Sequence, residues 1–215
     1  MRKTKGESRM VDFKLYLISS KTQCAPLPLE SAVAEACAAG VRAVQLREKN
    51  LPGRELYEEA RALRCVTAQA GARLFINDRA DIALAADADG IHCPENGLPI
   101  GTARALYRKG LIGVSVHSLE RAVDARMRGA DFVLFGPVFA TPSKMHYGRP
   151  QGLDALAAVA RDAGIPVFAV GGITEDRVSH CMERGAAGVA VISAIMSAGS
   201  ITKAVKEFEK SLGGL

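Results

Sequence analysis

The chain has 215 residues, which is the length of one domain or at most two small ones. Hydrophobic residues make up 48% and charged residues 24%, so the composition is globular and excludes disordered, collagenous and low-complexity chains. The 28 basic and 23 acidic residues give a formal charge of +5. Aromatic residues amount to only 5%, so we expect a core built from Ala, Val, Leu and Ile.

Residues 1–12 are predicted to form a flexible basic leader ahead of a single domain at 13–215. No apolar run accompanies the leader's cations, which excludes a secretory signal. No aromatic residues alternate with those cations either, so a nucleic-acid arm lacks support. Because no apolar run reaches the ~20 residues that span a bilayer, we expect a cytoplasmic protein with neither nucleic acid nor a membrane as partner.

The chain carries an odd number of cysteines and no CxxC pair. This pattern excludes zinc ribbons and redox dithiols. Cys37 and Cys65 fall within helical patterns, and we expect both to be small buried hydrophobic residues.

Eight short apolar runs recur along the chain and predict strands. They are continuous rather than alternating, which is typical of parallel strands buried on both faces. The runs lie at 13–18, 43–47, 74–77, 90–92, 112–116, 132–136, 167–171 and 189–193.

Stretches with helical spacing separate these runs. They lie at 31–39, 55–70, 78–86, 102–109, 119–128, 153–163, 175–184 and 201–212. Several end at a glycine, where a left-handed C-cap is expected, namely Gly40, Gly71, Gly129, Gly164 and Gly185. Eight strands alternating with eight helices predict an α/β fold, a (β/α)8 TIM barrel in one domain. A doubly wound open sheet is the alternative, but it usually has fewer strands, and no GxGxxG follows the first strand.

The active site of a TIM barrel lies where its strands end, and polar or cationic residues follow most of the predicted strands here. Arg47 and Lys49 alternate with Glu48, so the two cations can face one side. Asp78 follows the third strand, where one carboxylate together with phosphate oxygens suits Mg²⁺, although a helix cap is the alternative. Gly171 and Gly172 either form half of a phosphate site or only a tight turn. The site is therefore predicted to hold a diphosphate and Mg²⁺, while His92 and His117 are expected to be structural.

The motifs at these strand ends resemble those of the thiamine phosphate synthase family and its TenI-type thiazole tautomerase relatives. The resemblance covers the chain from about Leu15 to the last helix. The motifs are QLREK at 45–49, INDR at 76–79, DGIH at 89–92, GVSVHS at 113–118, GPVFATPSK at 136–144, AVGGI at 169–173 and VISAI at 191–195.

The resemblance implies a transferase that joins an aminopyrimidine diphosphate to a thiazole phosphate and releases diphosphate. Arg47, Lys49, Ser115 and Lys144 are implied as catalytic, and Asp78 and Asn96 as Mg²⁺ ligands. The implied substrate-binding set is Gln45, Leu46, Arg47, Glu48, Lys49, Asn77, Ser115, Thr141, Pro142, Ser143, Lys144, Gly172, Ile192 and Ser193. The implied partners are these small molecules, and a homo-oligomer is left open.

Two positions depart from the family pattern. Asn96 stands where the synthases carry a second acidic Mg²⁺ ligand, although Glu95 is a candidate substitute. Pro137 stands where the tautomerases carry a catalytic histidine. We expect a synthase, and the alternatives are a tautomerase, a regulatory protein that binds thiamine intermediates without turnover, and another phosphate-binding barrel.

Overall fold

The computed structural model describes residues 9–108, 110–141 and 149–213. Eight parallel strands, β1 to β8, close into a barrel in chain order. Their bounds are Leu15–Ile18, Ala43–Leu46, Arg73–Asn77, Gly90–Cys93, Leu111–Val116, Phe132–Phe135, Val167–Val170 and Gly188–Val191. The predicted TIM barrel is therefore confirmed, and each predicted strand is found within two residues at either end.

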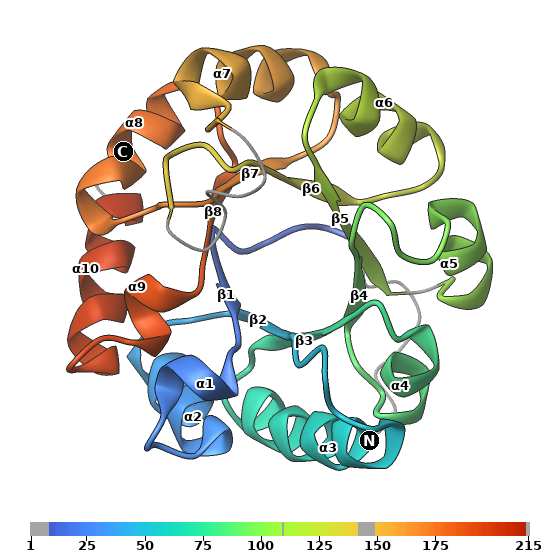
Figure 1. The fold of residues 1–215 in the computed structure, drawn as a ribbon, viewed down its shortest axis with the longest axis vertical. Coiled ribbons are helices and arrows are strands. Elements are labelled where there is room, and N and C mark those ends of the chain that lie inside the picture. Colours follow the sequence, from blue (N-terminus) through green and yellow to red (C-terminus); the bar gives the residue numbers. More distant parts are fainter. Residues whose placement is uncertain (1–8, 109, 142–148, 214–215) are drawn as a thin grey trace.

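The larger helices surround the barrel, as Figure 1 shows in a view down its axis. They are α2 (Leu29–Ala39), α3 (Gly53–Gln69), α4 (Ala80–Ala85), α5 (Ile100–Leu106), α6 (Leu119–Met127), α7 (Gly152–Asp162), α8 (Val178–Glu183) and α10 (Ile201–Gly213). A 3-10 turn, η2 (Glu175–Arg177), begins the α8 unit. Two short helices that the sequence did not predict, α1 (Lys21–Cys24) and α9 (Ser193–Met196), follow β1 and β8. Each has only four residues, too few to show helical periodicity.

The five glycines predicted to end helices all adopt positive φ angles, from 64° at Gly71 to 142° at Gly40. These helices therefore end where a glycine adopts the left-handed conformation.

The barrel interior is aromatic, contrary to the aliphatic core that composition suggested. The rings of Phe13, Tyr16, Phe75, Phe132 and Phe168 pack together inside it, with neighbouring centroids 5.2–6.5 Å apart. Aliphatic residues instead fill the space between the strands and the helices.

Glycines on neighbouring strands make room for these rings. A Cβ on Gly90 would lie 2.4 Å from Phe75, and one on Gly188 would lie 2.6 Å from Phe168. The few aromatic residues are thus concentrated where a barrel has the most volume to fill.

The described part of the predicted leader contacts the barrel. Arg73, at the start of β3, donates two hydrogen bonds to the Asp12 carboxylate, at 2.7 and 2.8 Å. Val11 packs against the aromatic cluster, whereas residues 1–8 lie outside the described residues.

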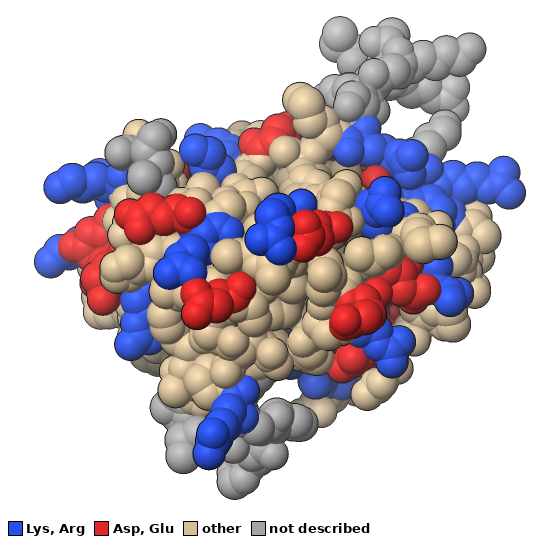
Figure 2. All heavy atoms as spheres, turned by 90° about the horizontal axis from the view of Figure 1, so that it is seen from above, with Lys and Arg blue, Asp and Glu red and all other residues tan. Residues whose placement is uncertain are grey.

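Basic and acidic side chains are interspersed over the face that carries α6 and α7, as Figure 2 shows. Among the described residues, no helix is both long enough and apolar enough to cross a membrane.

Candidate active site at the carboxyl ends of the strands

Polar side chains lie at and directly above the level of the aromatic rings, toward the end of the barrel where the strands finish. Side chains alternate between the two faces of a strand, so residues two positions beyond the inward-facing rings also face inward. Gln45 pairs in register with Phe75, and Asn77 pairs with His92. Ser115 follows Gly113 by two positions on β5. The structure therefore turns the predicted Asn77 and Ser115 inward above the rings, while the predicted Gln45 lies level with the ring of Phe75.

Two hydrogen bonds connect Gln45 and Ser115 to neighbouring side chains. Gln45 Nε2 donates to the Tyr16 hydroxyl at 3.3 Å, and both side chains are buried. His92 Nε2 lies 2.9 Å from Ser115 Oγ. Burial raises the pKa of Tyr16, so this hydroxyl stays neutral. Burial also lowers the pKa of His92 to about 3, and the nearby positive charge of Arg47 adds to that effect.

The segment after β2 is anchored to the neighbouring strand end. Arg47 is half-buried, and its backbone N–H donates to Ser19 Oγ at 3.1 Å. Ser19 is fully buried and was missed at the sequence level; its place directly after the first strand is the signal that could have found it.

Two residues of the predicted binding segment face other partners. Glu48 accepts a hydrogen bond from the backbone N–H of Lys21 at 2.8 Å, at the start of α1. Burial raises the pKa of the Glu48 carboxyl. Leu46 is 1% exposed and packs in the core between the strands and the helices. Lys49 is exposed at the mouth of the barrel.

Asp78 presents an exposed carboxylate beside the loop that follows β4. Its φ of 63° is left-handed, and its Oδ1 accepts a hydrogen bond from the backbone N–H of Leu98 at 3.4 Å. Gly97 is the loop residue that lies against this carboxylate, because a Cβ built there would be 2.4 Å from Oδ1. Asn96, the predicted second ligand, is the exposed residue just before it.

One exposed carboxylate fits Mg²⁺ when substrate phosphate oxygens complete its coordination. Among the described residues, no group of three or more His, Cys, Asp or Glu side chains is placed to hold a metal ion. Glu95, the candidate substitute ligand, instead has its Oε2 3.5 Å from His117 Nε2. The Nδ1 atom of His117 contacts the carbonyl oxygen of Gly136, at the end of β6.

The two glycines after β7 pack against the loop that follows β6. Gly171 and Gly172 have φ angles of 94° and 65°. A Cβ on Gly171 would lie 2.6 Å from Pro137 Cβ, and one on Gly172 would lie 2.7 Å from the carbonyl oxygen of Ala140. Close loop packing therefore accounts for both glycines, whatever ligand the loop holds.

The other residues predicted to bind the thiazole phosphate follow β6 and β8. Ile192 is half-buried and Ser193 is exposed as the first residue of α9. Thr141 is the last residue described before the gap at 142–148, so the calls on Pro142, Ser143 and Lys144 fall outside the described residues.

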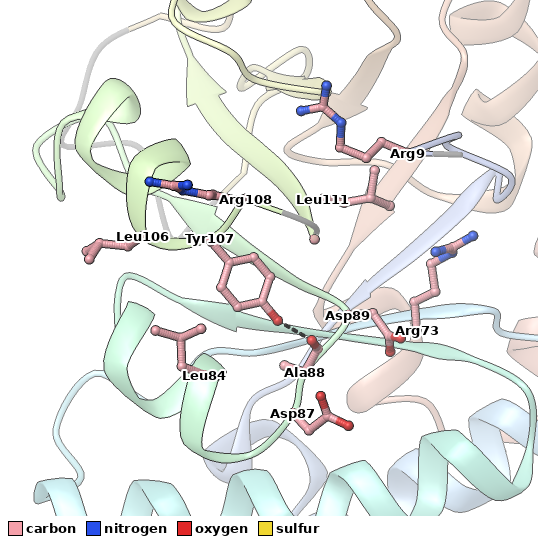
Figure 3. Close-up of a pocket in the computed structure, with 11 residues that line it drawn as sticks. Arg9, Arg73, Leu84, Asp87, Ala88, Asp89, Leu106, Tyr107, Arg108 and Leu111 are labelled. Atoms are coloured by element: carbon pink, nitrogen blue, oxygen red, sulfur yellow. Dashed lines mark hydrogen bonds between the residues drawn. The ribbon is translucent and has the colours of Figure 1, made fainter. Parts of the chain in front are cut away.

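A separate hollow of about 450 Å³ lies at the opposite end of the barrel, where the strands begin. Figure 3 shows Tyr107, whose hydroxyl donates to the carbonyl oxygen of Ala88, between Leu84 and Arg108. Arg73 and Asp89 line it too and are engaged in ion pairs with Asp12 and Arg64. None of the predicted site residues that the structure describes lines this hollow.

Fold and site together define a TIM barrel whose strand ends present neutral polar groups, cations and the Asp78 carboxylate, a set suited to a phosphorylated small molecule. The family model described as thiamine monophosphate synthase matches residues 15–195. The chain therefore belongs to the thiamine monophosphate synthase family.

Individual relatives agree with this assignment. The chain is 55% identical over 188 residues to a putative thiamine-phosphate synthase of Geobacter sulfurreducens, covering 87% of this chain and 88% of the relative. It is 38% identical over 200 residues to a thiamine-phosphate synthase of Chloroflexus aurantiacus, covering 93% of each. Among solved structures, a thiamine phosphate pyrophosphorylase from Pyrococcus furiosus superposes with a TM-score of 0.87 at 39% identity, covering 94% of this chain and 96% of that one.

Proposed function

We propose that this protein is a thiamine-phosphate synthase, a transferase that joins an aminopyrimidine diphosphate to a thiazole phosphate and releases diphosphate. The observation that carries the proposal is the polar set of Gln45, Asn77 and Ser115 on the barrel strands of a member of this family, with Arg47 directly after β2 and its charge acting on the neighbouring His92.

In this reaction, the bond between the pyrimidine methylene carbon and the diphosphate oxygen breaks, and a bond from that carbon to the thiazole nitrogen forms. Arg47 and Lys49 stabilise the charge that grows on the departing diphosphate. Gln45, Asn77 and Ser115 orient the pyrimidine diphosphate so that the methylene carbon faces the thiazole. No side chain has to act as a nucleophile.

Mg²⁺ is part of this proposal, with Asp78 as its protein ligand and diphosphate oxygens as the others. When bound, the ion neutralises charge on the leaving group. Asn96 is proposed as a second, uncharged ligand of the ion, and Lys144 is proposed to bind the diphosphate as a further cation.

The thiazole phosphate is proposed to bind between the loops after β6, β7 and β8. Thr141, Pro142, Ser143, Gly172, Ile192 and Ser193 are the residues proposed to hold it.

The direct test combines the purified protein, the pyrimidine diphosphate, the thiazole phosphate and Mg²⁺ and follows thiamine phosphate by chromatography. We expect product only when all four are present, and no product above background without Mg²⁺ or in Asp78→Asn. Thermal stabilisation by the substrates without any product would instead identify a regulatory binder.

A second assay addresses the tautomerase alternative. Proline has no group that can move a proton, so with Pro137 after the strand-six glycine we expect no rapid isomerisation of the dearomatised thiazole carboxylate phosphate. His117, which contacts Glu95, is the base this site would otherwise offer. Fast isomerisation that disappears in His117→Ala would therefore replace the synthase proposal by a tautomerase.

A further inference from the structure

His92 and Ser115 form a polar pair on neighbouring strands at the centre of the barrel mouth. His92, on β4, is 2% exposed, and its Nε2 lies 2.9 Å from the Oγ of Ser115 on β5. Ser115 is half-buried and reaches the mouth, whereas His92 lies beneath it among the rings of Tyr16 and Phe132, at 6.1 and 6.4 Å. Ser115 is therefore the described hydrogen-bond partner through which His92 can influence a ligand.

The other nitrogen of His92 is buried and has no hydrogen-bond partner among the residues that the structure describes. This Nδ1 packs on the backbone of Gly113, since a Cβ built on that glycine would lie 2.8 Å from it. The hydrogen that Gly113 carries in place of Cβ therefore lies between the ring of Phe132, whose Cζ is 2.4 Å from that Cβ position, and Nδ1. A lone pair on Nδ1 accepts such a weak C–H contact, whereas an N–H there would point hydrogen at hydrogen.

These contacts select one form of the imidazole. A neutral histidine has one N–H donor and one acceptor nitrogen. Orphaned buried N–H donors are rarer in proteins than under-satisfied acceptors, so the proton belongs on Nε2, where Ser115 Oγ accepts it. Burial and the Arg47 charge lower the pKa of His92, in keeping with an uncharged ring.

We propose that His92 is a positioning residue whose Nε2–H donates to Ser115 Oγ, which directs the Ser115 hydroxyl proton to an acceptor atom of the bound pyrimidine diphosphate. The opposite arrangement would turn that proton toward His92 and leave only oxygen lone pairs facing an anionic substrate. The substrate in this statement rests on the proposed function.

Two isosteric variants test the role of Nε2. The amide nitrogen of Gln can occupy the place of Nε2, whereas that of Asn reaches only the place of Nδ1. His92→Gln should thus retain most of kcat/KM for the pyrimidine diphosphate, while His92→Asn should lose about tenfold or more, the effect of one hydrogen bond to a charged group. Equal activity of the two variants, at comparable melting temperatures, would overturn the proposal.

Ser115→Ala completes the comparison. It should lose as much as His92→Asn, and the double variant His92→Asn/Ser115→Ala should be no worse than either single variant, because both act through one hydroxyl. If the fold-loss of the double variant equals the product of the two single losses, His92 acts independently of Ser115, and the proposal is overturned.

Nitrogen-15 NMR of the unmodified protein decides the tautomer without reference to activity or to the folding of any variant. We expect the proton of His92 on Nε2, with the resonance assigned by its loss in His92→Gln. A proton on Nδ1 would overturn the proposal. Absence of thiamine phosphate from the assay of the unmodified protein would instead refute the proposed function and leave the tautomer measurement valid.

Discussion

Replacing Gly113 by alanine should destabilise the barrel at a crowded point of its interior. Gly113 lies on β5 between the ring of Phe132 and the imidazole of His92. A Cβ at this position would be 2.4 Å from Phe132 Cζ and 2.8 Å from His92 Nδ1, closer than van der Waals contact permits. One of these two side chains must move to admit the methyl group.

The surrounding rings determine how much this movement costs. Phe132 is fully buried, and the rings of Phe13, Tyr16, Phe75 and Phe168 lie 5.5–5.6 Å from its own. With neighbours on several sides, the ring cannot retreat without displacing another. Overpacking a filled core costs ~1–3 kcal/mol, and we expect the upper end, about 3 kcal/mol. For a chain of this length, that corresponds to a decrease in Tm of about 6–12 °C.

Thermal melts followed by circular dichroism measure the effect, with Gly101→Ala as the matched control. Gly101 lies in α5 with nothing within 4 Å of its Cβ position, so alanine there should leave Tm unchanged or raise it slightly. Phe132→Leu shortens the side chain that meets the new methyl, so the double variant Gly113→Ala/Phe132→Leu should be more stable than the sum of the single effects predicts. Equal melting temperatures for Gly113→Ala and Gly101→Ala would refute the packing argument.

Three further predictions concern the site and the thiols. Arg47→Ala should weaken binding of the pyrimidine diphosphate about tenfold or more in calorimetry, because a charge-assisted hydrogen bond is lost; unchanged binding would remove Arg47 from the site. Asn96→Asp should lower the Mg²⁺ concentration needed for half-maximal activity, since it adds a charged oxygen ligand near Asp78, and no change would place Asn96 away from the ion. Cys65 is exposed while burial raises the pKa of Cys93 to about 11, so iodoacetamide should label Cys65 first at pH 8. Intact-mass measurement of Cys65→Ser should then show no rapid labelling, and rapid labelling that persists would contradict the assignment.

The exposure of Cys65 also corrects a sequence-level expectation. Cys37, in α2, is buried as predicted, and burial raises the pKa of its thiol to about 11. Cys65 lies on the outer face of α3, near Arg61 and Tyr57. Both cysteines fall in helical patterns, but the pattern did not show on which face of its helix each one lies.

The strands and most helices follow from the sequence alone, because their signals are local. Continuous apolar runs mark strands covered on both sides, and glycines such as Gly71 and Gly164 stop helices where a left-handed residue is required. The rule that barrel sites lie at strand ends then predicted a site near Arg47, Lys49 and Asp78 before any contact was known.

Contacts between strands were decided only by the tertiary structure. Closure of the barrel and its register place Gly113 opposite His92. The missing side chain of Gly113 leaves space for the ring of Phe132, and His92 Nδ1 has no hydrogen-bond partner among the described residues. The same register sets Ser115 beside His92, and the start of α1 engages the Glu48 carboxylate. These residues are distant in the chain, and their meeting depends on how eight strands stagger around a closed sheet, which no local periodicity encodes.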